Sequence, residues 1–96
     1  MQSVSFYMSA GAVMDKLLHY LRSRGYESLT VNYSSLEIRT EKKDSFFRRN
    51  KYFFKIAGTG EEITKIEVSV NPEKQIKSTD DSNQEERICE KIYDYF

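Results

Sequence analysis

The sequence predicts a single α+β domain, residues 1–96, in which an antiparallel sheet carries two helices on one face. The chain of 96 residues has the length of one domain. Apolar residues recur at every second position in five segments and at helical spacing in two others. The resulting order, β-α-β-β-β-β-α, places four strands in succession, which favours an antiparallel meander with one apolar face. Both helices are expected on that face, and the other face is expected to be open to water.

The first two elements are a short strand and an amphipathic helix. The strand alternates apolar and polar residues, and its apolar members are Val4, Phe6 and Met8. Ser9 stands at the position of a helix N-cap. Helical spacing then continues through Val13, Leu17 and Leu21. Gly25 is expected to end this helix in the left-handed conformation.

The middle of the chain has the period of strands. Two strands joined by a turn over residues 32–35 are predicted by the alternating apolar positions Leu29, Val31, Tyr33, Leu36 and Ile38. A fourth strand is expected over residues 52–57. A fifth is expected over residues 63–70 and ends at Asn71-Pro72, because proline lacks the N–H group that a strand ladder needs. The residues expected on the open face are Thr30, Glu37, Arg39, Phe53, Lys55, Lys65, Glu67 and Ser69.

The last part of the chain combines a polar segment with a second amphipathic helix. Residues 73–84 have no hydrophobic period and predict a solvated loop. Ser82 and Glu85 are spaced as in a capping box, so the helix is expected to begin there. Its apolar stripe is Ile88, Ile92 and Phe96. Its acidic ridge is Glu86, Glu90 and Asp94, either a solvated face or a surface that complements the basic segment of a neighbouring molecule.

The strongest charge feature is the segment KKDSFFRRNKYFFK, residues 42–55. It holds six of the fifteen positive charges, five aromatic rings and one acid, in a chain with no net charge. If residues 42–51 form the turn between the third and fourth strands, their cations project from one tip. The candidate binding residues are Lys42, Lys43, Phe46, Phe47, Arg48, Arg49, Lys51 and Phe53.

Three interpretations of this basic-aromatic segment stay open. In the first, Phe46 and Phe47 cover the sheet edge and the charges keep that edge soluble. In the second, the cations bind the phosphates of a lipid headgroup or a single-stranded nucleic acid. The neutral net charge disfavours nucleic acid, whose binders are usually basic. In the third, the segment contacts a protein partner or a second copy of the chain.

Metal, cofactor and catalytic chemistry have little support in the sequence. One cysteine, Cys89, and one histidine, His19, leave no zinc cluster and no internal disulfide. His19 has no nucleophile at triad spacing, and Cys89 is expected to be a semi-buried structural thiol. Gly58 and Gly60 join two strands and do not open a helix, so they are expected to form a turn and not a phosphate loop. The expectation is a non-enzymatic module with no metal and no cofactor.

The compartment is predicted only from missing signals. No apolar run approaches the ~20 residues that cross a bilayer, and the N-terminus lacks the basic and apolar regions of a signal peptide. The chain as written is expected in the cytoplasm. If a leader has been removed, the expected location is the cell envelope or periplasm.

The text VMDKLLHYLRSRGYESLTVNYSSLEIRT, with the element order, resembles the opening of a known group of small domains. This is the TBP-like group, which includes the kinase-associated (KA1-like) domains and the domains of BamC-type envelope lipoproteins. The resemblance covers about a third of the chain and implies a non-enzymatic module that binds a protein partner or an anionic phospholipid. The expected function is therefore protein–protein interaction or assembly, with anionic ligand binding through residues 42–55 as the alternative.

Overall fold

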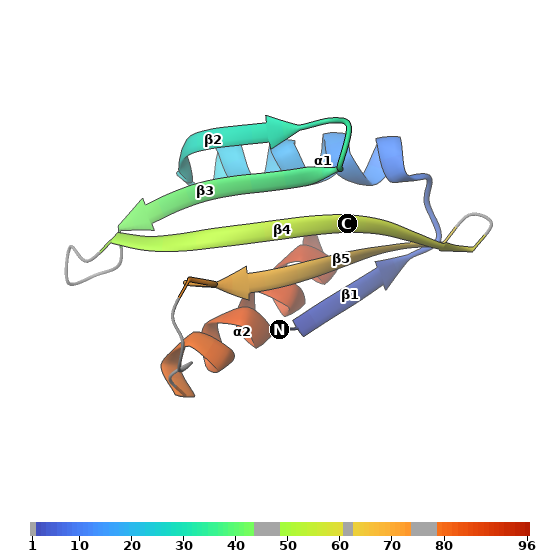
Figure 1. Ribbon diagram of the computed structural model, residues 1–96. Helices are drawn as coiled ribbons and strands as arrows, with labels where there is room; N and C mark the ends of the chain where they lie inside the picture. The colour runs from blue at the N-terminus through green and yellow to red at the C-terminus, as the bar shows by residue number, and fades with distance from the viewer. Residues whose placement is uncertain (1, 44–48, 61–62, 74–78) are drawn as a thin grey trace.

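The computed structural model describes residues 2–43, 49–60, 63–73 and 79–96 (Figure 1). The described residues form one sheet and two helices, and they confirm the predicted order of elements. The elements are β1 (Gln2–Phe6), α1 (Ala10–Ser23), β2 (Glu27–Asn32), β3 (Glu37–Lys43), β4 (Arg49–Gly60), β5 (Ile63–Val70) and α2 (Thr79–Tyr95).

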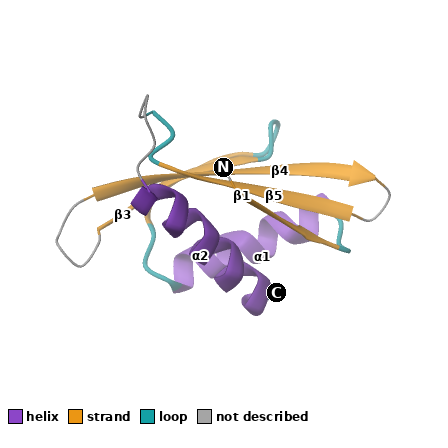
Figure 2. Cartoon of the chain, turned by 90° about the horizontal axis from the view of Figure 1, so that it is seen from below, coloured by secondary structure: helices purple, strands orange, loops and turns teal. Residues whose placement is uncertain are grey.

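The five strands form one antiparallel sheet in the spatial order β1-β5-β4-β3-β2 (Figure 1). The last four strands are the predicted meander, and β1 pairs with β5 at the far side from β2. Helix α1 therefore carries the chain from one sheet edge to the other. Both helices lie on the same face of the sheet (Figure 2), where α1 packs on β4 and α2 packs on β5 and β1. The predicted two-layer α+β architecture is confirmed.

Helix α1 begins and ends where the sequence predicts. The Oγ atom of Ser9 accepts a hydrogen bond from the backbone N–H of Ala12 at 3.3 Å, as an N-cap does. Gly25 has φ of +81°, the left-handed conformation that only glycine adopts without strain. The buried face of α1 comprises Val13, Met14, Leu17, Leu18, Tyr20 and Leu21.

The core lies between the sheet and the two helices. Alternate residues of the three central strands point into it and are buried: Ile38, Tyr52, Phe54, Ile56, Ile66, Val68 and Val70. Helix α2 adds Ile88, Cys89 and Ile92, of which Ile92 is fully buried. Because side chains alternate along a strand, the residues between these positions lie on the uncovered face, which we call the open face.

The β2–β3 hairpin is irregular at both ends. Ser28 has φ of +53°, and the strand register shifts between Glu27 and Thr30, as in a bulge. The Oγ1 atom of Thr40 donates a hydrogen bond of 2.6 Å to the Glu27 carbonyl beside this bulge. At the turn, Asn32 Oδ1 accepts hydrogen bonds from the backbone N–H groups of Ser34 and Ser35, two and three residues further along the chain. This confirms the turn predicted at residues 32–35.

Strands β3 and β4 are longer than the sequence predicts. The prediction of a turn over residues 42–51 is wrong for residues 42 and 43, which belong to β3, and for residues 49–51, which belong to β4, while residues 44–48 lie outside the described residues. Their ladder continues through the pairs Lys42–Asn50 and Lys43–Arg49. Charged residues with long apolar stems are compatible with a sheet end, because the stems lie along the strands while the charges stay in water.

Helix α2 begins at Thr79, so the predicted loop over 73–84 and the start at Ser82 are wrong for residues 79–84. Asp80 and Asp81 lie in its first turn, where negative charge is favourable. The predicted capping partner, Glu85, is instead fully buried, and its Oε2 atom accepts a hydrogen bond of 2.8 Å from the Val70 N–H. Because Asp81 and Glu85 are polar but buried, the first turns of α2 lack the apolar spacing by which a helix is predicted.

Asn71, the residue after β5, ties the end of the sheet to the start of α2. Its N–H donates to the Lys51 carbonyl at 2.7 Å, and its Oδ1 accepts from the Lys51 N–H at 3.0 Å. Its Nδ2 group donates to Asn50 Oδ1 at 3.2 Å and to Asp81 Oδ1 at 3.1 Å. Asn71 has φ of +49°, a conformation that asparagine tolerates better than most residues. This side chain therefore fixes β4, β5 and α2 relative to one another.

Candidate functional site

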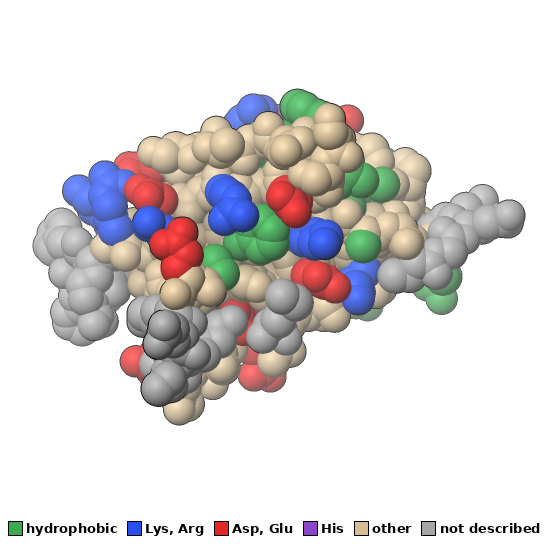
Figure 3. Space-filling model, in the orientation of Figure 1, with side chains coloured by type: hydrophobic (Ala, Val, Ile, Leu, Met, Phe, Trp, Pro, Cys, Tyr) green, Lys and Arg blue, Asp and Glu red, His purple; other side chains and the backbone are tan. Residues whose placement is uncertain are grey.

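The open face of the sheet brings together acids, bases and one aromatic ring. Figure 3 shows acidic and basic side chains interspersed over this face, with hydrophobic atoms near its middle. On β3 and β4 the residues facing each other are Glu37 and Lys55, Arg39 and Phe53, and Glu41 and Lys51. Each of these three cross-strand pairs joins a cation to an acid or to an aromatic ring.

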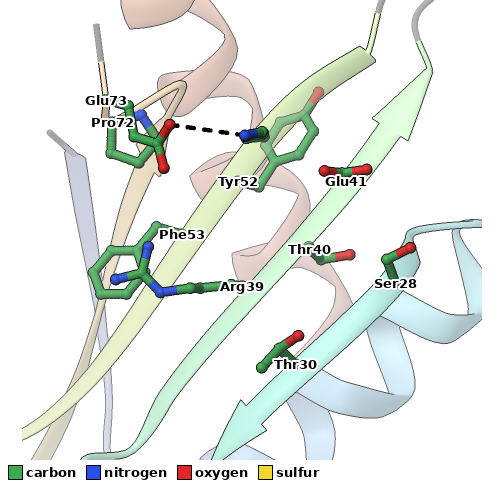
Figure 4. Close-up of a pocket in the computed structure, with 10 residues that line it drawn as sticks. Ser28, Thr30, Arg39, Thr40, Glu41, Tyr52, Phe53, Pro72 and Glu73 are labelled. Atoms are coloured by element: carbon green, nitrogen blue, oxygen red, sulfur yellow. Dashed lines mark ion pairs between the residues drawn. The ribbon is translucent and has the colours of Figure 1, made fainter. Parts of the chain in front are cut away.

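Phe53 and Arg39 form the centre of the open face (Figure 4). The Arg39 guanidinium carbon lies 4.6 Å from the centroid of the Phe53 ring, within the range of a cation–π contact. The ring is half-buried, and the arginine is exposed. The sequence predicts Phe53 as an outward apolar residue, and the structure confirms this while covering one side of its ring with a cation.

A shallow hollow of about 270 Å³ lies on the open face beside this pair. Strand β2 contributes Ser28 and Thr30 to its wall, and Pro72 and Glu73 close the far side (Figure 4). The Nζ atom of Lys51 lies 3.7 Å from the Glu73 carboxylate across this end. The hollow thus combines hydroxyl groups, an aromatic ring and charges of both signs.

The predicted binding residues do not all lie on the same face of the sheet. Lys43, Arg49 and Lys51 lie on the open face with Phe53. Arg49 is already paired, since its Nη1 atom lies 3.0 Å from Glu41 and 3.5 Å from Glu27. Lys42 points to the helix side, where its Nζ atom lies 4.9 Å from the centroid of the Tyr26 ring. Phe46, Phe47 and Arg48, the other predicted members, lie outside the described residues.

The sequence places Glu37 on the open face but does not predict the acids that pair with the basic residues, which are Glu27, Glu41 and Glu73. Glu37 and Arg39 are predicted on the open face and Glu41 has no predicted role, although charged residues alternate with uncharged ones from Glu37 to Glu41. Extending the strand to Lys43 predicts Arg39 and Glu41 beside the basic residues of β4. The missed signal is therefore the continuation of the two-residue period through charged residues.

The other residues considered for chemistry lie apart from the open face. His19 is exposed on α1, and the acidic ridge of Glu86, Glu90 and Asp94 is exposed on α2. Cys89 is buried on the core side of α2. Among residues 2–43, 49–60, 63–73 and 79–96, no group of three or more histidine, cysteine or acidic residues is arranged to hold a metal ion.

Cys89 is expected to react slowly with alkylating agents. Burial, with a smaller contribution from the charge of Glu85, raises the pKa of its thiol from 9.0 to about 11. Two pKa units reduce the thiolate fraction about 100-fold near neutral pH, so iodoacetamide should label the native protein at least that much more slowly than the urea-unfolded chain. Stability should also fall between pH about 9 and about 11, because the folded state holds its proton more tightly. Equal labelling rates at pH 8 would contradict the burial of this thiol.

The chain matches no protein-family model and no curated protein in the comparisons made. The resemblance to TBP-like domains of the KA1-like or BamC type therefore stays a prediction, and the class defined here is that of a small α+β domain with an open sheet face. Neither helix, as far as the structure describes them, is long and apolar enough to cross a membrane.

Proposed function

We propose that this chain is a protein-interaction or assembly module, without catalysis, that docks through the open face of its sheet. The observation that carries this proposal is the Arg39–Phe53 pair, an exposed arginine on a half-buried ring at the centre of a face with both signs of charge. Arginine and aromatic residues are enriched at the energetic centres of protein interfaces. The hollow beside the pair offers room for a side chain of the partner.

A protein partner fits this face better than an anionic polymer or membrane. Nucleic acids and anionic lipids are bound by surfaces on which basic residues cluster without acids. Here Arg49 lies against Glu41, and Lys51 lies against Glu73. The phosphates of an anionic partner would have to displace these carboxylates. A partner that itself carries both signs of charge would complement them.

The arrangement of charges on the open face is complementary to a second copy of the chain. A twofold axis parallel to the strands and midway between β3 and β4 would place each residue opposite its own cross-strand neighbour in the other copy. Acids would then face lysines, and Arg39 would face Phe53. The pairs repeated across the dimer would be Glu37 with Lys55, Arg39 with Phe53, and Glu41 with Lys51.

Sedimentation velocity over a range of concentration and salt measures this association. The wild type is expected to dimerise, more weakly as the salt rises from about 0.01 M to about 1 M because screening weakens exposed charge pairs. Phe53→Ala should raise the dissociation constant about 30-fold, the effect of losing ~2 kcal/mol at an interface centre. Lys55→Glu should weaken the dimer as well, and the double exchange Glu37→Lys/Lys55→Glu should restore it.

Arg87→Ala is the matched control, because Arg87 is an exposed arginine on α2, in the helix layer. It should dimerise like the wild type. A wild-type chain that stays monomeric at high concentration and low salt contradicts association of two copies. A dimer that is equally stable with Phe53→Ala and Lys55→Glu contradicts the open face as its interface.

A further inference from the structure

A second hollow, on the helix side of the sheet, gathers three cations around two tyrosines. It has a volume of about 310 Å³, at the lower end of the ~300–1,000 Å³ typical of small-molecule sites. Its lining residues are Tyr20, Arg24, Tyr26, Lys42, Ile88 and Lys91. None of these residues is acidic, which distinguishes this hollow from the charge-balanced open face.

The three cations come from separate parts of the fold. Arg24 is the C-cap residue of α1, Lys42 is near the end of β3, and Lys91 is on α2. Arg24 lies over the Tyr20 ring, with its guanidinium carbon 5.5 Å from the ring centroid. Lys42 lies over Tyr26 in the same way. Helix, sheet and ring contacts therefore hold these charges at one place in the tertiary structure.

The arrangement is electrostatically unfavourable without an anion. Burial lowers the pKa of Lys42, and the positive charges of Lys91 and Arg24 lower it further. The described part of the chain provides no ion pair for any of the three cations, whereas Arg49, Lys51 and Lys65 each have at least one. A bound anion would remove the repulsion between the cations, and the rings that fix Arg24 and Lys42 would already hold them in place.

We propose that this hollow binds the phosphoryl group of a small soluble phosphomonoester. The planar guanidinium of Arg24 can donate two parallel hydrogen bonds to phosphate oxygens, and the two lysines supply further charged donors. The hollow is larger than a phosphate alone requires. Tyr26 and Ile88 provide ring and aliphatic surface for the organic part of the ligand. This site is independent of the open face and of the association proposed for it.

Amide chemical shifts of the ¹⁵N-labelled protein, titrated with inorganic phosphate and then with phenyl phosphate at constant ionic strength, test the site. Saturable shifts are expected around Arg24, Lys42 and Lys91, with tighter binding of phenyl phosphate because its ring contacts Tyr26. The variants Lys42→Gln and Lys91→Gln should each raise the dissociation constant about tenfold, the usual effect of losing one hydrogen bond to a charged group.

Lys16→Gln is the matched control for Lys42→Gln. Lys16 also lies over an aromatic ring, with its Nζ atom 5.6 Å from the Phe96 centroid, but it is absent from the lining of the hollow. It should bind both ligands like the wild type. The melting temperature gives a second readout: phosphate should raise it more in the wild type and Lys16→Gln than in Lys91→Gln, whose exposed side chain is not needed for folding.

Four outcomes would overturn the proposal. The first is a set of shifts that grow linearly and do not saturate. The second is saturable binding centred on Lys43 and Arg49 at the end of the hairpin. The third is binding to vesicles that contain phosphatidic acid with none to phenyl phosphate, which would indicate a membrane surface and not a soluble ligand. Unchanged affinity in both Lys42→Gln and Lys91→Gln would also exclude this hollow as the site.

Discussion

Phe54→Ala is expected to lower the free energy of unfolding by about 3–5 kcal/mol, the usual loss for a large aromatic ring removed from a core. Phe54 is fully buried on β4 between Ile38 and Val68 of the neighbouring strands. Its ring also meets Tyr26 edge-on, with centroids 6.3 Å apart. Since domains of this size are stable by only about 5–15 kcal/mol, a large part of the total would be lost. Urea denaturation followed by circular dichroism measures the loss.

The adjacent phenylalanine provides the control. Phe53 lies on the opposite face of the same strand, half-buried under Arg39. Phe53→Ala should lower the unfolding free energy by about 1 kcal/mol or less, because a partly exposed ring and one cation–π contact are lost. The two variants should therefore separate stability from association. Similar losses of stability for both would contradict the assignment of Phe54 to the core and Phe53 to the open face.

Glu85→Ala is expected to lower the free energy of unfolding by about 3 kcal/mol. The Glu85 side chain is fully buried on α2, and its Oε2 atom accepts the hydrogen bond of the Val70 N–H. Removing it leaves a buried backbone donor without its acceptor, which costs about 1–3 kcal/mol, and opens a cavity beside β5. Because the contact joins α2 to the sheet, the loss should appear in thermal and urea unfolding alike.

Two variants control this result. Glu85→Gln keeps a carbonyl oxygen of similar position, so it should retain the bond to Val70 and lose less stability than Glu85→Ala. Glu86→Ala removes the next acid, which is exposed, and should change stability by no more than about 0.5 kcal/mol. A Glu85→Ala protein as stable as Glu86→Ala would show that the bond to Val70 contributes nothing net.

The elements with strict apolar periods were predicted well. Strand β5 runs from Ile63 to Val70, residue for residue as the alternation and the following proline predict. Helix α1 is bounded by Ser9 and Gly25, because its caps are local chemistry that the sequence contains. The layer order follows from the same patterns, since two apolar stripes and one apolar sheet face can be buried only against one another.

The elements that depend on tertiary contacts were not predicted. The start of α2 depends on Asp81 and Glu85, whose partners are Asn71, just after β5, and Val70, the last residue of β5. The ends of β3 and β4 consist of charged and polar residues paired through their backbones, and these residues show no apolar period. The predicted binding site of residues 42–55 differs from the observed arrangement for this reason. Because Lys42 is part of β3, the alternation of side chains along the strand places it on the helix side of the sheet. Lys43 and Arg49 lie on the opposite, open face.

The position of β1 has a consequence for how the chain folds. Its partner β5 is the last strand of the β2–β5 meander. Val4 therefore pairs with Ile66, a residue far from it in the sequence. The hairpin contacts of β2 to β5 close short loops, and the β1–β5 contact closes a long one, which is slower because of its entropy. The nascent meander can form while the N-terminal strand is still free. The edge of β5 is then available to any extended segment until β1 adds to it.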